Sequence, residues 1–325
     1  MKQNEHIKKI DSSRLQHFPV VMFAIIMGLA GLTLVFKRLN EVLFLPYFIP
    51  LVFTILTSIV YFLILGIYLL KIFKYKKEIK EELVHPIRIN FFAAISISTL
   101  LLSIIYKNSL LEFSNILFII GASLHIFFTF YTIKHWINND LQIQHSNPAW
   151  FIPIVGNLIV PIAGEGFIDD SILYFYFSIG IFFWIVLFSI ILNRMIFHKQ
   201  FAQKFMPTLF ILIAPPSIAF ISYIKLTHEL DFFAHILYSL GLFFTILVFV
   251  MYKNYINIKF FISWWAFTFP MATITLASIL MFEITNKIVY SFLAYTFTFI
   301  TTIIIFFVAR ATIKHIIKKE ICIME

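Results

Sequence analysis

The chain has 325 residues, of which 61% are hydrophobic and only 13% charged, and its formal net charge is +9. A soluble domain carries roughly 25% charged residues, so this composition excludes a water-soluble globular protein and favours a chain surrounded by lipid. The single cysteine, Cys322, excludes an internal disulfide and a cysteine-rich metal centre.

Ten apolar segments follow one another along the chain, and each is long enough to cross about 30 Å of hydrocarbon as a helix. A lipid-facing backbone has to satisfy its own hydrogen bonds, which favours helices, and the alternating strands of a membrane barrel are absent. The first segment lacks a small-residue cleavage site, so we expect it to remain as a span. The segments cover residues 18–36, 46–72, 88–106, 113–135, 149–167, 172–195, 207–226, 232–252, 261–282 and 287–312.

The sequence therefore predicts an all-α integral membrane protein. Its parts are an N-terminal tail over residues 1–17, a ten-helix transmembrane domain over 18–312 and a C-terminal tail over 313–325. The links after odd-numbered segments are short, and short links join antiparallel neighbours. The ten segments thus form five helical hairpins, which fit a ring.

Basic residues are distributed unequally between the links. Twenty of the 25 Lys and Arg residues lie in the two tails and in the links after even-numbered segments. Because cytoplasmic links carry an excess of basic residues, we expect both tails in the cytoplasm and the chain in a cell membrane. The positive charge is thus assigned to topology and not to a nucleic-acid partner. The five basic residues of the opposite side are Lys37, Arg38, Lys107, Lys225 and Lys287.

Helix-breaking residues gather in the odd-numbered segments. Proline frees backbone groups inside a helix, and such groups are tolerated at membrane depth only inside protein or beside water. We therefore expect odd segments inside and even segments facing lipid; ordinary packing kinks are the alternative. The residues concerned are Pro19, Gly28 and Gly31 in the first segment, Pro153, Gly156, Asn157, Pro161 and Gly164 in the fifth, Pro207, Pro215 and Pro216 in the seventh, and Pro270 in the ninth. The third segment carries Ser96, Ser98 and Thr99 instead.

Ionisable residues within the segments are few. His125 in the fourth segment is either hydrogen-bonded between helices or a proton-coupling group. Glu165, Asp169 and Asp170, at the outer end of the fifth segment, are expected to be solvated. No two histidines lie three to five residues apart, and nucleotide-binding and HExxH motifs are absent. No catalytic residue, metal or cofactor is therefore expected.

The ninth segment contains the most specific sequence pattern. The run from Ser263 to Thr273, SWWAFTFPMAT, resembles the W-[AS]-[FY]-[ST]-F-[PG] stretch of the tellurite-resistance/dicarboxylate transporter family. That family includes bacterial TehA and the plant guard-cell slow anion channels. Other positions agree with the family in order and spacing: Phe18-Pro19, Gly28-Leu29-Ala30, His85-Pro86-Ile87-Arg88, Pro153, Asn157 and Ala214-Pro215. Ile26 and Ser96 stand where relatives often have proline.

The resemblance implies a quasi-fivefold ring of five hairpins around a central pore, assembled as a homotrimer. It implies passage of small anions through a pore closed by a phenylalanine, which the motif places at Phe269. Alternatives on the same fold are a proton-coupled C4-dicarboxylate carrier, with His125 as its candidate coupling group, and a tellurite-resistance exporter. The residues expected to kink or line the pore are Pro153, Pro215, Pro270, Ser96, Asn157 and Thr273.

Overall fold

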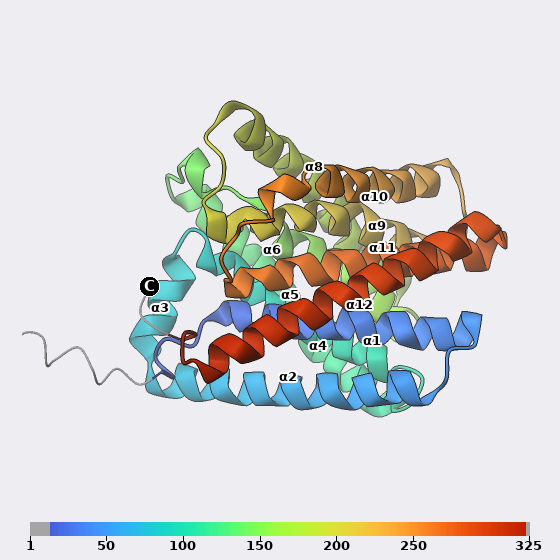
Figure 1. Ribbon diagram of the computed structural model, residues 1–325, viewed down its shortest axis with the longest axis horizontal. Helices are drawn as coiled ribbons and strands as arrows, with labels where there is room; N and C mark the ends of the chain where they lie inside the picture. Colours follow the sequence, from blue (N-terminus) through green and yellow to red (C-terminus); the bar gives the residue numbers. More distant parts are fainter. Residues whose placement is uncertain (1–13, 323–325) are drawn as a thin grey trace, which may run out of the picture.

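The computed structural model describes residues 14–322, and every regular element in that range is helical (Figure 1). Most of the predicted N-terminal tail (residues 1–13) and the last three residues lie outside the described residues. The observed elements reproduce the ten predicted segments to within a few residues at most ends. The all-helical membrane fold predicted from composition is therefore confirmed.

Five long helices are mostly exposed, and five inner spans are mostly buried. The outer helices are α2 (Phe48–Lys74), α5 (Leu111–Asn138), α8 (Asp170–Phe197), α10 (Phe232–Val250) and α12 (Ile288–Ile317). Four inner spans join a 3₁₀ turn to an α-helix: η2 (Val20–Met22) with α1 (Phe23–Leu43), η3 (Arg88–Phe92) with α4 (Ala93–Tyr106), η7 (Gln203–Ile213) with α9 (Ala214–Thr227), and η9 (Ile262–Phe267) with α11 (Thr268–Thr285).

The fifth inner span is broken into η5 (Pro148–Phe151), α6 (Ile152–Val155), η6 (Gly156–Leu158) and α7 (Ile159–Gly164). In the described part of the chain, nine other helices are long and apolar enough to cross a membrane, and this one is shorter. Its 3₁₀ turns rise ~2.0 Å per residue against ~1.5 Å in α turns, so it extends roughly 29 Å. It is therefore long enough to span the hydrocarbon as well.

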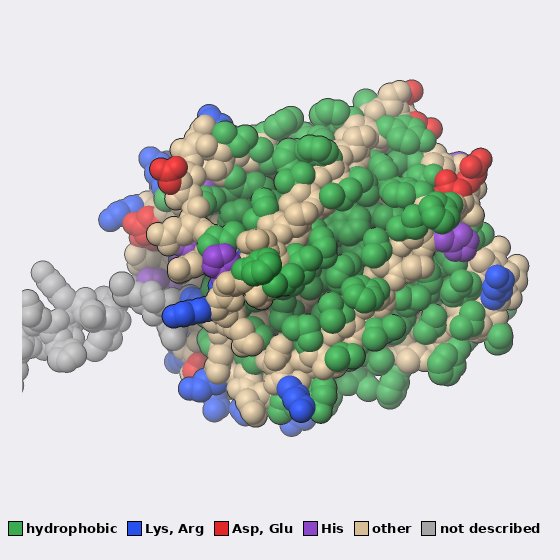
Figure 2. Space-filling model, turned by 90° about the horizontal axis from the view of Figure 1, so that it is seen from above, with side chains coloured by type: hydrophobic (Ala, Val, Ile, Leu, Met, Phe, Trp, Pro, Cys, Tyr) green, Lys and Arg blue, Asp and Glu red, His purple; other side chains and the backbone are tan. Residues whose placement is uncertain are grey.

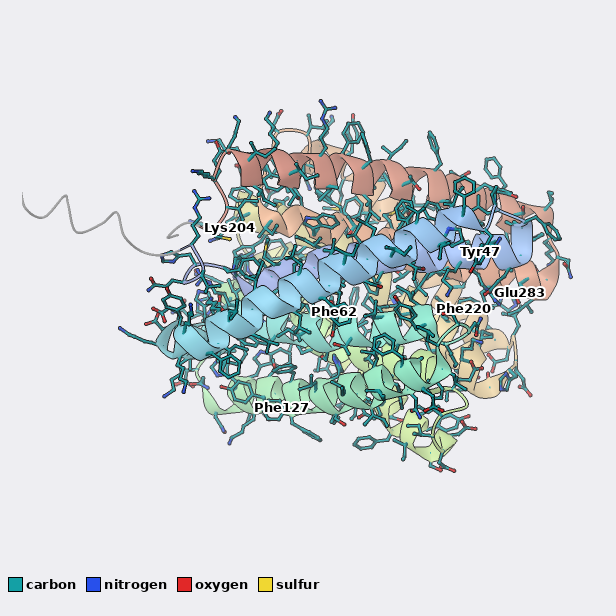
Figure 3. The ribbon with its side chains drawn as sticks, turned by 90° about the horizontal axis from the view of Figure 1, so that it is seen from below. Tyr47, Phe62, Phe127, Lys204, Phe220 and Glu283 are labelled. Atoms are coloured by element: carbon teal, nitrogen blue, oxygen red, sulfur yellow. The ribbon has the colours of Figure 1, made fainter. Side chains whose placement is uncertain are left out.

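Burial separates the two layers. In the most apolar stretch of each span, 67–83% of the residues of the four longer inner spans are buried, against 22–39% in the outer helices. Phe62 on α2 and Phe127 on α5 are 52% and 58% exposed, and both lie on the outer surface (Figure 3). The predicted division between odd and even segments is thus confirmed.

Contacts between the inner spans form a closed circuit. Helix α1 packs on α4 and α11, α4 packs on α7, and α9 packs on both α7 and α11. The central axis of the molecule is therefore enclosed by one helix from each predicted hairpin. The quasi-fivefold symmetry itself stays a prediction.

The charged side chains collect at the two ends of the molecule, and an apolar belt lies between them (Figure 2). Residues 16–17 and 320–322 line one pocket, so both described ends of the chain lie at the same end of the molecule, here called the terminal end. Lys204 also lies there, whereas Tyr47 and Glu283 lie at the opposite, distal end (Figure 3).

Three elements differ from the sequence prediction. Helix α1 continues to Leu43, past the predicted end at residue 36, because Arg38 and Glu41 pair one turn apart and keep the polar end helical. The link after the second segment contains an extra helix, α3 (Lys76–Val84). An apolar run shows which residues meet lipid, but the helix itself can continue past the end of that run. Helix α12 likewise continues to Ile317, into the region predicted as a tail.

Candidate functional site

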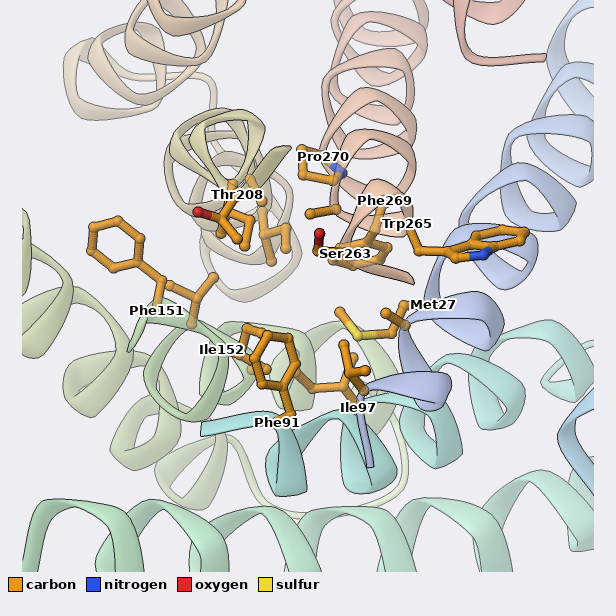
Figure 4. A pocket seen from close by; sticks show the side chains of 18 of the residues that line it. Met27, Phe91, Ile97, Phe151, Ile152, Thr208, Ser263, Trp265, Phe269 and Pro270 are labelled. Atoms are coloured by element: carbon orange, nitrogen blue, oxygen red, sulfur yellow. The ribbon is translucent and has the colours of Figure 1, made fainter. Parts of the chain in front are cut away.

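A small cavity of about 50 Å³ lies between the inner spans (Figure 4). Most of its lining residues come from the 3₁₀ turns and the first helical turns of these spans, which places it in the half of the molecule nearer the terminal end. Every inner span contributes to its wall, and the side chains there are almost all apolar. The hydroxyl of Thr208 donates to the carbonyl of Phe205 at 2.6 Å, and the hydroxyl of Ser263 donates to the carbonyl of Lys204 at 2.5 Å. These hydroxyls on the wall are thus already bonded to backbone.

A larger cavity of about 260 Å³ opens toward the distal end, and it is called here the distal vestibule. Four of the five basic residues of the predicted outer side line it, together with two glutamates. They come from α1, α9 and the residues that follow α4 and α7. The charged lining residues are Lys37, Arg38, Lys107, Lys225, Glu41 and Glu165.

Three side chains border both cavities: Ile159 on α7, Ile218 on α9 and Phe269 on α11. Phe269 is the largest of the three, and it is 8% exposed. The wall between the two cavities is therefore wholly apolar, and Phe269 forms a large part of it.

The local sequence explains why Phe269 stands there. It is the second residue of α11, directly after the 3₁₀ turn η9, which Trp265 anchors by donating from Nε1 to Thr312 Oγ1 at 2.9 Å. Pro270 follows in the first helical turn, where its missing N–H leaves no hydrogen bond unmade. A Cβ at Gly31 of α1 would come within 2.7 Å of Ala272 Cβ and 3.4 Å of Phe269 Cδ2. The glycine thus lets α1 and α11 approach closely behind the ring.

A third cavity, of about 480 Å³, lies at the terminal end and shares Val21 with the central cavity. The three cavities thus follow one another along the molecule. Among the residues predicted to kink or line a pore, Pro270 borders the central cavity and Thr273 the vestibule. Pro153 and Pro215 occupy the first turns of α6 and α9 and lie outside these linings.

Ser96 and Asn157 also lie outside the cavities, in a buried polar cluster between α4, α5 and the broken span. Ser96 Oγ lies 2.9 Å from His125 Nδ1, and the hydroxyl of Thr129 donates to the carbonyl of Pro153 at 2.8 Å. The amide of Asn157 donates to Thr129 Oγ1 and to the carbonyls of Pro153 and Ile154. The cluster therefore satisfies backbone carbonyls that the helix breaks leave free.

His125 is hydrogen-bonded between helices α4 and α5 through Ser96, which was one of the two alternatives that the sequence left open. It is fully buried, and its Nε2 has no hydrogen-bond partner among residues 14–322. That atom faces Gly156, where a Cβ would lie 2.5 Å away, and Gly156 lines the central cavity.

The expectation that Glu165 is simply solvated is wrong. Its carboxylate oxygen Oε2 lies 3.0 Å from Lys225 Nζ and 3.5 Å from Lys107 Nζ, on the wall of the vestibule. Tertiary packing brings together three residues from the distal ends of different inner spans, far apart in sequence, so no local pattern could have revealed the cluster. Asp169 does cap α8, as its side chain accepts from the Ser171 N–H at 2.9 Å.

The chain matches the family model described as SLAC1, voltage-dependent anion channel, over residues 17–313. It is 25% identical to the S-type anion channel SLAH3 of Arabidopsis thaliana over 93% of this chain and 49% of the relative, so it spans about half the length of that plant protein. It is 25% identical to transporter MJ0762 of Methanocaldococcus jannaschii over 84% of this chain and 87% of the relative. The tellurite resistance protein TehA homolog of Haemophilus influenzae is 26% identical over 78% of each chain.

Proposed function

The chain belongs to the SLAC1 voltage-dependent anion channel family, and from this membership we propose that it passes small anions along its central axis, with Phe269 closing the path. The path runs from the distal vestibule through the central cavity to the pocket at the terminal end. The relatives named as anion channels support the anion as the passing species. The homotrimer expected from the resemblance stays a prediction.

The observation that carries the proposal is the position of Phe269 in the wall shared by the two cavities. An anion that enters an apolar constriction loses hydration, at a cost of several kcal/mol even in a relaxed protein. The ring of Phe269 excludes water and offers no N–H or O–H donor, and hydrophobic constrictions close channels in this way. A ring that moves aside would join the two cavities.

The vestibule supplies the complementary part of the path. Four cationic and two anionic side chains line it, so the cavity carries a positive excess. A concave wall of one charge sign concentrates the opposite ion near its surface. Anions would thus gather directly in front of Phe269.

The test is the anion flux of Phe269→Ala in liposomes with an anion-substitution series. Removal of the ring is expected to raise the flux at least tenfold, since each 1.4 kcal/mol removed from a barrier is about tenfold. Phe267→Ala is the matched control, because the Phe267 ring makes edge-to-face contacts with Phe210 and Tyr255 and lines neither cavity. A folded Phe269→Ala protein that conducts no better than its parent would refute the closure.

A proton-coupled dicarboxylate carrier remains the alternative that one observation favours. Nε2 of His125, which has no hydrogen-bond partner among the described residues, lies against Gly156, and Gly156 separates it from the central cavity. A carrier would take up malate in proportion to the inward proton gradient and would lose that coupling in His125→Gln. Currents that follow the Nernst potential of chloride or nitrate support the channel. Export of tellurium oxyanions, suggested by the name of one relative, would appear in the same substitution series.

A further inference from the structure

One carboxylate in the distal vestibule is shared by two lysines. Lys225 Nζ lies 3.0 Å and Lys107 Nζ 3.5 Å from the same oxygen, Oε2 of Glu165. Lys107 also donates to the main-chain carbonyl of Glu165 at 2.7 Å. The three residues lie at the distal ends of three different inner spans, so the cluster joins α4, α7 and α9 around the mouth of the path.

The charges of this cluster do not balance. A single carboxylate neutralises one of the two ammonium groups, and a net positive charge remains. The three side chains are only 24–35% exposed, so water screens their charges incompletely. Burial is the largest influence that lowers the pKa of Lys107, and neighbouring Lys225 lowers it further while Glu165 raises it. The two lysines thus carry one positive charge more than Glu165 neutralises.

Arg38, which also lines the vestibule, has the opposite balance of charge. Arg38 pairs with two carboxylates, those of Glu41 and Glu283. Lys37 donates to the main-chain carbonyl of Ile105, so the excess of positive charge is shared by Lys37, Lys107 and Lys225. The cavity of about 260 Å³ beside them leaves room for a small anion with some of its water.

We propose that Lys107 and Lys225 form a binding site for a small monovalent anion at the mouth of the path, and that Glu165 is a tethered carboxylate that occupies this site until the anion displaces it. This inference rests on the proposed function, because it treats the vestibule as the entrance of the path. Glu165 then sets the anion concentration at which the path fills.

The experiment measures nitrate binding to the full-length protein by isothermal titration, at fixed low ionic strength. Glu165→Gln removes the competing charge and keeps the shape of the side chain, so its nitrate affinity is expected to rise about tenfold, which corresponds to about 1.4 kcal/mol. Glu41→Gln removes the same negative charge from the same cavity but frees no lysine pair, and Arg38 keeps Glu283 as its partner. The nitrate affinity of this variant is therefore expected to change less than about twofold. Equal changes in the two variants would overturn the site.

Lys225→Gln gives a second test that does not depend on the folding of Glu165→Gln. It leaves Glu165 and Lys107 as a neutral pair, so nitrate binding is expected to weaken by about tenfold. Unchanged binding in folded Lys225→Gln protein would overturn the proposal. Anion flux of the parent is measured separately, so absence of flux refutes the proposed function, whereas absence of the binding shifts refutes only this site.

Discussion

At the scale of one residue, Gly156 shows how the broken inner span packs against the outer helix α5. Its backbone lines the central cavity, and the direction in which a side chain would point is filled by the ring of His125. Ser96 fixes that ring through Nδ1. The outer helix α5 can approach the inner span closely because Gly156, on the facing side of that span, has no Cβ.

We predict that Gly156→Ala destabilises the protein. The new Cβ would lie 2.5 Å from His125 Nε2 and 2.8 Å from Ile97 Cδ1, so neighbouring groups must shift. Overpacking of a buried site costs about 1–3 kcal/mol, and thermal unfolding in detergent measures it. Gly66→Ala on α2 is the control, since no atom of the neighbouring described residues lies within 4 Å of its Cβ position.

A double substitution makes the cause specific. If the clash with His125 is responsible, His125→Ala should cost less stability in the Gly156→Ala background than in the parent. Additive effects of the two substitutions would contradict this account and place the strain at Ile97 instead.

At the scale of elements, α3 is fixed by a buried ion pair. Lys71 at the end of α2 and Glu82 on α3 are 1% and 3% exposed, and their charged atoms lie 3.0 Å apart. Tyr68 donates to the same carboxylate at 2.9 Å, and Lys71 donates to the carbonyl of Phe18 at 2.9 Å. The pair therefore joins α2, α3 and the start of the first inner span at the terminal end.

We predict that Lys71→Met lowers stability by about 3–5 kcal/mol, because it leaves the Glu82 carboxylate buried without a counter-ion. Thermal unfolding measures the loss, and Glu82→Gln added to Lys71→Met should recover a large part of it. The control is Lys77→Met, whose partner Glu81 is 4.0 Å away on an exposed surface and should contribute at most about 1 kcal/mol. Equal losses in the two single variants would show that burial of the pair is unimportant.

At the scale of the whole molecule, charge and lipid decide the orientation. Both described ends of the chain and α3 lie at the terminal end, and an apolar belt separates that end from the distal vestibule (Figure 2). The excess of basic residues at the terminal end favours the cytoplasmic side for it. We therefore expect the vestibule and the proposed anion site to face the exterior.

We predict that a phosphatase active only outside the cytoplasm is inactive when fused after Glu325 in bacteria, and that a reporter active only in the cytoplasm works there. The same two reporters fused after Ser109, in the link between α4 and α5, should give the reverse result. Phosphatase activity after Glu325 would invert the orientation and place the vestibule inside the cell.

Regular hydrophobic runs explain why much of the fold was predictable. Each span must cover the same thickness of hydrocarbon, so apolar length alone located ten segments, and proline and glycine content separated the inner from the outer layer. Phe269 was identified by its motif, and the structure places it at the wall between two cavities, although its role in closure stays a proposal.

Tertiary structure alone decided which polar residues meet. Lys107, Glu165 and Lys225 lie at the distal ends of three different inner spans and converge only because those spans end side by side. Lys71 lies near the end of the predicted second segment and Glu82 in the link after it, and their burial follows from the packing of α3 on α2. Ser96 and Asn157 were expected in the pore but face α5, because helical rotation depends on packing partners that a single sequence does not specify. Apolar length is a property of one segment, whereas a charge cluster is a property of several.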